Sequence, residues 1–154
     1  MGTDAMVEIV AGRDLDVSQR EAWDAFVDWD RQREWMIGTR VRTTRNAGRG
    51  VGAGIVGRTA LGPFGFDDPM TIVTWDPPTL CAVRHDGRLV RGTGDFRVVD
   101  IGDGRSCLLW SEHLTLPFGP LGRAGWRVVR PIAQRIMERS LERFNRYACA
   151  RAGR

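Results

Sequence analysis

His85 and Glu112 are the two side chains of this sequence whose types and surroundings could support acid–base chemistry. An imidazole titrates near neutral pH, and a carboxylate among apolar residues needs a partner, a raised pKa or water around it. Glu112 shares alternate strand positions with four large apolar residues: Leu108, Trp110, Leu114 and Leu116. If both groups face one interior, they could exchange protons with a bound molecule or orient its polar end.

The segment VRHDGRLVRGTGDF, residues 83–96, predicts a β-hairpin that turns at Asp86-Gly87 beside His85. A two-residue turn pairs Val83 with Val90, and paired residues point to the same face. That face then carries Cys81, Val83, His85, Val90, Gly92, Gly94, Phe96 and Val98. Glycine inside a strand leaves nothing to pack, so we interpret Gly92 and Gly94 as space in front of the sheet. Such glycines also let a sheet coil sharply, which is the purely structural alternative.

The strand that carries Glu112 follows a second turn signal, Asp103-Gly104. A tight turn there would place Glu112 on the face opposite His85, so a bulge or a longer turn is required to bring them together. His85 and Ser140 are candidate partners for the Glu112 carboxylate, and Trp126 is a candidate wall of the space. His113 falls on the opposite, solvent-facing set.

Other chemistry-bearing patterns are absent from the sequence. The glycine-rich stretch GRGVGAG, residues 48–54, lacks GxxxxGK and precedes a strand-like segment, which argues against phosphate binding. There is no Gly-x-Ser-x-Gly, no HExxH and no CxxC, and two histidines are too few for most metal sites. We therefore expect no cofactor and no metal.

The elements around these residues predict an α+β fold. A first strand is followed by two short helices, of which the first has a capping box formed by Ser18 and Glu21. About six antiparallel strands follow, separated by Gly, Pro and Asp-Gly. The last thirty residues change to a helical period, with Pro131 either starting or kinking the helix. One face of this helix carries Trp126, Val129, Ile132, Ala133, Ile136, Met137, Ser140, Leu141, Phe144 and Tyr147.

Length and composition fit one domain spanning residues 1–154. No apolar run is long enough for a transmembrane segment, the start lacks the basic segment of a signal peptide, and three scattered cysteines suit a reducing cytosol. We therefore expect a cytoplasmic protein. All 23 basic residues are Arg and none is Lys, which indicates a GC-rich, actinobacterial-like genome more than nucleic-acid binding. The Arg-rich C-terminal helix is either a solvated face or a docking face for an acidic protein partner.

The order of these elements, together with AWDAFVDWDRQREW, DDPMTIVTWDPP, RHDGRLVRGTGDF, LLWSEHLTLPFG and SLERF, resembles the START/Bet v 1-like (SRPBCC) superfamily. Within it, the chain is similar to the bacterial polyketide cyclase/dehydrase-like group. The resemblance implies a helix-grip fold, in which a curved sheet of six to seven strands surrounds the C-terminal helix and an apolar cavity. It supplies no universal catalytic motif, so no catalytic residue is carried over from it.

Three functions follow from this sequence. The first is binding of a hydrophobic small molecule, such as a lipid, a fatty acyl group or a polyketide, in the cavity. The second is a cofactor-free cyclase or dehydratase that uses His85 and Glu112 as acid and base. The third is docking of an acidic protein partner, and a homodimer is a further alternative. The residues expected to contact a ligand are Val83, Val90, Gly92, Gly94, Phe96, Trp110, Trp126, Val129, Ala133, Ile136 and Ser140.

Overall fold

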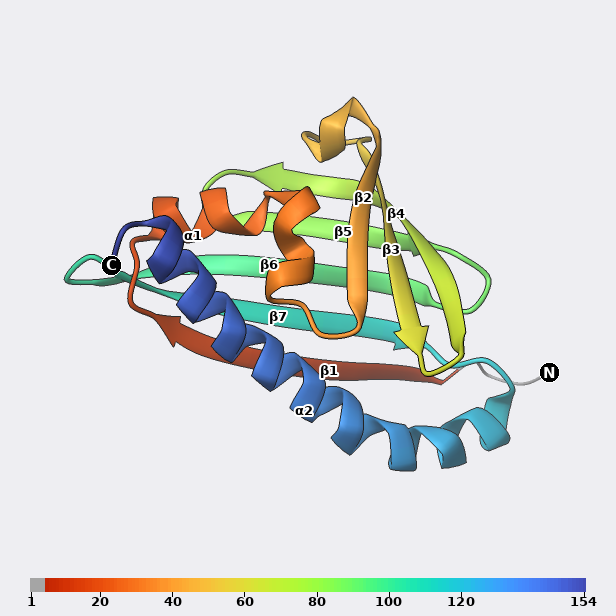
Figure 1. Ribbon diagram of the computed structural model, residues 1–154. Helices are drawn as coiled ribbons and strands as arrows, with labels where there is room; N and C mark the ends of the chain where they lie inside the picture. The colour runs from red at the N-terminus through yellow and green to blue at the C-terminus, as the bar shows by residue number, and fades with distance from the viewer. Residues whose placement is uncertain (1–4) are drawn as a thin grey trace.

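Seven antiparallel strands and one long helix make up most of the protein, as the computed structural model of residues 5–154 shows (Figure 1). The strands are β1 (Met6–Leu15), β2 (Thr39–Arg45), β3 (Gly54–Leu61), β4 (Phe64–Asp76), β5 (Leu80–Asp86), β6 (Arg91–Gly102) and β7 (Arg105–Thr115). The helices are α1 (Gln19–Phe26), η1 (Trp29–Glu34), η2 (Asn46–Gly48) and α2 (Gly119–Arg151). Residues 1–4, on which part of the signal-peptide argument rests, lie outside the described residues.

The strands form one sheet in the order β1-β7-β6-β5-β4-β3-β2. In Figure 1, β2 and β3 run steeply across the direction of β1 and β7, so the sheet is strongly bent. Helix α2 crosses the concave side, and α1 and η1 lie at the end where α2 finishes. The predicted α+β helix-grip arrangement, with two short helices after the first strand, is confirmed.

Local signals explain two of the element boundaries. The side chain of Ser18 accepts a hydrogen bond from the Glu21 amide, and Glu21 accepts one from the Ser18 amide, which completes the predicted capping box of α1. Asp103 and Gly104 both have positive φ, as a type I′ hairpin turn requires. The register shifts between Asp100 and Gly102, and this bulge gives Glu112 the parity that the sequence analysis required.

The predicted two-residue turn between β5 and β6 is wrong. Asp86 pairs with Arg91, so the loop contains residues 87–90. The longer loop places Cys81 opposite Phe96, and both side chains are buried. Packing of these two residues outweighs the local turn signal. The register differs from the predicted one by an even number of residues, so the side chains that remain in β5 and β6 keep their predicted faces.

Helix α2 is divided into a buried half and an exposed half. Its buried residues are Met137, Ser140, Leu141, Phe144 and Ala148, all in the second half. In that half Phe144 packs edge-on against Trp35, with ring centroids 4.9 Å apart. Val129 and Ile132 are 50% and 57% exposed, which corrects their predicted place on the inward face. The first turns of α2 lie clear of the strands in Figure 1, and in this part of the helix Trp126 is half-buried against the core.

Within residues 5–154, no helix has the length and hydropathy needed to cross a membrane.

Candidate functional site

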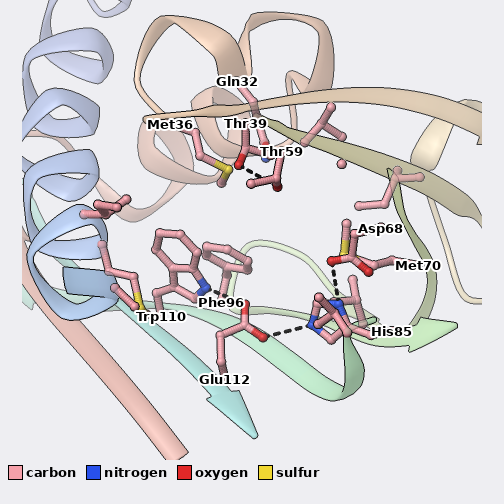
Figure 2. Close-up of a pocket in the computed structure, with 18 of the residues that line it drawn as sticks. Gln32, Met36, Thr39, Thr59, Asp68, Met70, His85, Phe96, Trp110 and Glu112 are labelled. Atoms are coloured by element: carbon pink, nitrogen blue, oxygen red, sulfur yellow. Dashed lines mark hydrogen bonds and ion pairs between the residues drawn. The ribbon is translucent and has the colours of Figure 1, made fainter. Parts of the chain in front are cut away.

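A cavity of about 310 Å3 lies between the concave face of the sheet, η1 and the middle of α2 (Figure 2). Most of its wall is apolar: the sheet contributes residues such as Ile55, Met70 and Val83, and α2 contributes Trp126, Ala133, Ile136 and Met137. The structure places seven of the residues expected to contact a ligand in this wall: Val83, Val90, Phe96, Trp110, Trp126, Ala133 and Ile136. His85 and Glu112 line the same cavity.

Two helix residues expected in this wall lie elsewhere. Val129 is half exposed and is not among the residues that line the cavity. Ser140 is fully buried, and its hydroxyl accepts a hydrogen bond from the amide of Ile37 at 3.1 Å. Ser140 therefore anchors the η1–β2 connection to α2 and is not a partner of Glu112.

Gly92 and Gly94 are required by close contacts and do not leave space for a ligand. A Cβ atom at Gly94 would lie 2.5 Å from Oε2 of Glu112, so the carboxylate occupies the place of the missing side chain. Gly92 has a φ of +124°, and a Cβ atom there would collide with the carbonyl oxygen of His113. The prediction that these glycines open the cavity is corrected: they allow Glu112 and the β7 backbone to approach β6.

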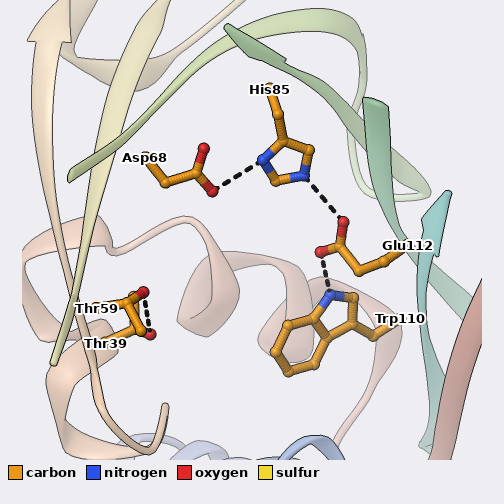
Figure 3. A network of polar contacts seen from close by, with 6 residues as sticks. All are labelled: Thr39, Thr59, Asp68, His85, Trp110 and Glu112. Carbon is orange, nitrogen blue, oxygen red and sulfur yellow. Dashed lines mark hydrogen bonds and ion pairs between the residues drawn. The ribbon is translucent and has the colours of Figure 1, made fainter. Parts of the chain in front are cut away.

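Four polar side chains of the cavity form a continuous hydrogen-bonded chain across β4, β5 and β7 (Figure 3). His85 bonds through Nδ1 to Asp68 Oδ2 at 2.8 Å and through Nε2 to Glu112 Oε2 at 2.9 Å. Trp110 donates from Nε1 to Glu112 Oε1 at 2.8 Å. The three charged side chains are largely shielded from solvent, with exposures of 13% for Asp68, 5% for His85 and 15% for Glu112. We name this set the Asp68–His85–Glu112 chain.

The Asp68–His85–Glu112 chain holds its histidine in the charged form. Burial alone lowers the pKa of His85, but the hydrogen bonds and charges of Asp68 and Glu112 outweigh burial and raise the pKa to about 10. At neutral pH both ring nitrogens therefore carry protons, and both protons are donated to carboxylates. Nearby, burial raises the pKa of the Cys81 thiol to about 12, so this cavity residue stays neutral.

Asp68 was not identified from the sequence. The strand pattern in PMTIVTW begins only at Pro69, so it leaves Asp68 outside the predicted strand. In the structure β4 begins at Phe64, and alternate residues Phe66, Asp68, Met70 and Ile72 share the inner face. The period of two extending back from Ile72 was the signal that could have found it.

A second polar pair was also missed. Thr39 on β2 and Thr59 on β3 pair across the strands, and their hydroxyls lie 3.2 Å apart. They line the cavity at a distance from the Asp68–His85–Glu112 chain (Figure 3). Gln32 of η1 also lines it and donates to the carbonyl of Phe26. Two threonines carry no distinctive signal in a sequence, because threonine is common in strands.

The Arg-rich face of α2 is solvent-exposed. Arg135, Arg139 and Arg143 are exposed, and Arg143 donates to the carbonyl of Glu34. Between residues 113 and 137 the chain contains no Asp or Glu. An acidic protein partner or a second copy of the chain at this face stays a prediction.

Comparison with known proteins gives a family-level match over most of the chain. The family model described as polyketide cyclase / dehydrase and lipid transport matches residues 6–148. No curated protein sequence matches the chain.

Solved structures with low sequence identity share the fold. The ZhuI aromatase/cyclase from Streptomyces sp. R1128 aligns with a TM-score of 0.79 at 14% identity, covering 96% of each chain. The di-domain ARO/CYC StfQ of the steffimycin biosynthetic pathway gives 0.76 at 14%, covering 98% of this chain and 53% of that one. Norcoclaurine synthase from Thalictrum flavum, in complex with dopamine and hydroxybenzaldehyde, gives 0.65 at 14%, covering 92% and 86%.

Proposed function

The chain belongs to the polyketide cyclase/dehydrase and lipid transport family, and from this premise we propose that it binds a hydrophobic small molecule in its cavity. The observation that carries the proposal is the cavity itself. Its wall is largely apolar and its polar groups are gathered at defined positions, which is typical of small-molecule sites. A core that served stability alone would be filled, because protein interiors are close-packed.

The size of the cavity limits the ligand. Pockets for small molecules span about 300–1,000 Å3, and this one, at about 310 Å3, lies at the lower end. A compact ring system or a short acyl chain fits such a volume better than a whole diacyl lipid. Burial of apolar ligand surface would supply the affinity, at about 25 cal/mol per Å2.

The test is to fill the cavity and measure binding of a neutral probe. Ala133 of α2 lines the cavity, whereas Ala124 of the same helix is exposed, so Ala133→Phe and Ala124→Phe are matched variants. We expect Ala133→Phe to weaken binding of N-phenyl-1-naphthylamine at least tenfold by fluorescence titration, and Ala124→Phe to leave it unchanged. Native mass spectrometry of protein purified from its own host would show whether a ligand is retained. Failure of the unchanged protein to bind any apolar probe would overturn the proposal.

Catalysis is the second candidate function. His85 and Glu112 line one cavity and bond to each other, which brings an acid and a carboxylate to the same space. With its pKa raised to about 10, however, His85 is not a base at neutral pH, so Glu112 is the group that could accept a proton. A cyclase or dehydratase would convert its bound compound, whereas a binding protein would release it unchanged.

A further inference from the structure

At the polar end of the cavity, the side chains that the structure describes offer hydrogen-bond acceptors and no free donor. Both N–H groups of His85 donate to carboxylates, and the indole N–H of Trp110 donates to Glu112. The oxygens of Asp68 and Glu112 keep unused lone pairs, because a carboxylate has about four acceptor positions. A ligand group that approaches the Asp68–His85–Glu112 chain therefore has to donate.

The two oxygens of Asp68 differ in their surroundings. Its Oδ1 atom is buried and accepts no hydrogen bond from any part of the chain that the structure describes. A buried polar atom without a partner is energetically costly. This atom has almost no surface open to the cavity, so a ligand donor would have to use the other carboxylate oxygens of Asp68 and Glu112, which line the cavity.

The net charge of the Asp68–His85–Glu112 chain also favours a ligand group that donates. The chain holds one imidazolium and two carboxylates, so its net charge is negative, and its members are only 5–15% exposed. Charges interact strongly where solvent screens them poorly. A carboxylate on the ligand would meet this negative charge without a donor to bind it, whereas a hydroxyl or an ammonium would be accepted.

A flat apolar wall adjoins the acceptor end. Phe96 and Trp110 stack with ring centroids 5.1 Å apart and planes 25° from parallel, and Phe26 packs against Phe96 at 4.4 Å. The indole of Trp110 is tied to Glu112 by its N–H, so the aromatic wall and the acceptor are held side by side (Figure 3). Aromatic rings bind well against such surfaces.

We propose that the cavity selects aromatic ligands whose polar group donates a hydrogen bond, a phenolic hydroxyl or an ammonium, and that it rejects carboxylates. This inference rests on the proposed function and narrows it. Free fatty acids, one class suggested by the sequence, are excluded by it.

The test compares compounds that share one ring system and differ in the polar group. 2-Naphthol, 2-naphthylmethylammonium, 2-naphthoate and naphthalene are each titrated at pH 7 against bound N-phenyl-1-naphthylamine. We expect 2-naphthol, the ammonium or both to bind at least tenfold more tightly than 2-naphthoate and more tightly than naphthalene. Tighter binding of the ammonium would identify charge as the main basis of recognition. Tighter binding of 2-naphthol would identify the hydrogen bond from a neutral donor as that basis.

Three outcomes would count against the inference. If 2-naphthoate binds as tightly as 2-naphthol, or if all compounds bind equally, the inference is overturned while the proposed function stands. If neither the probe nor any compound binds, both are overturned together.

Carboxylate-to-amide variants locate the recognition. Glu112→Gln keeps the shape of the side chain but removes its charge, so the preference for 2-naphthol over 2-naphthoate should shrink at least threefold. Glu8→Gln is the matched control. Glu8 also has a histidine neighbour, with its Oε2 atom 3.6 Å from Nδ1 of His113, but its side chain is 60% exposed. Asp68→Asn provides a second variant if Glu112→Gln does not fold. An undiminished preference in the folded variant would overturn the assignment.

Discussion

A doubly hydrogen-bonded imidazolium sets the chemistry of this cavity at the residue scale. Asp68, His85 and Glu112 come from three different strands, and each hydrogen bond between them is 2.8–2.9 Å long. Removal of one partner from a buried charge cluster costs about 3–5 kcal/mol, because the others lose their compensation. We therefore regard the three residues as one unit whose protonation state is fixed by its members.

His85 should remain doubly protonated well above neutral pH, because Asp68 and Glu112 outweigh the effect of burial and raise its pKa to about 10. An NMR titration of the ring nitrogens should show no change for His85 between pH 6 and 8. The chain has two histidines, so His85→Gln identifies the signal. A midpoint below pH 7 would contradict the expectation.

The same pKa predicts how stability depends on pH. The folded-state pKa lies above the unfolded value of about 6.5, so protonation of His85 contributes stability that is complete below about pH 6.5 and is lost as the pH rises toward 10. The free energy of unfolding should therefore fall by roughly 2–3 kcal/mol from pH 6.5 to 9. His85→Gln should lack this part of the slope, as measured by urea denaturation at each pH.

Sequence reasoning found two of the three charged residues. His85 and Glu112 stood out because one lies beside a turn and the other among large apolar residues on one strand face. Asp68 did not, because the strand pattern in the sequence begins only at Pro69, whereas β4 itself begins at Phe64. Gly92 and Gly94 were noticed for a valid reason, the absence of side chains on an inner face, but only coordinates show that Glu112 and the His113 backbone occupy that place.

Helix α2 performs two tasks at the scale of elements. Its second half packs against α1, η1 and the sheet through Leu141 and Phe144, while its middle residues Ala133 and Ile136 line the cavity. The helical period of the sequence could not separate these halves, because the same apolar face continues through both. Whether a sheet lies opposite a given turn depends on tertiary placement, which periodicity does not contain.

Two truncations to alanine should distinguish the halves of α2. Leu141→Ala removes a fully buried side chain and should lower the free energy of unfolding by about 2–5 kcal/mol. Ile132→Ala removes a side chain that is 57% exposed and should change it by about 0.5 kcal/mol or less. Chemical denaturation of both variants makes the measurement. Equal losses of unfolding free energy in the two variants would mean that Ile132 is buried, as its place on the apolar face of the predicted helix suggested.

The overall architecture was predictable from the sequence, whereas the contents of the interior were not. Strand alternation, turn residues and the final change to a helical period together specify a sheet wrapped around one helix. The parity of each strand survived a wrong loop length between β5 and β6, because the register differed by an even number of residues. The shape and volume of the cavity depend on how the bent sheet and α2 meet, which no local signal encodes.

Ligand binding should change the stability of one part of the molecule more than the rest. The second half of α2 and the aromatic residues around Trp35 are packed without the ligand, so they exchange amide hydrogens slowly in either state. The middle of α2 and strands β2 and β3 face the cavity, and a bound molecule would add contacts between them. Saturating 2-naphthol or N-phenyl-1-naphthylamine should therefore slow hydrogen–deuterium exchange at residues 126–137 and 39–59. Residues 141–151 should change little. Protection confined to residues 141–151, or absent from 126–137, would mean that the ligand does not lie between the sheet and the helix.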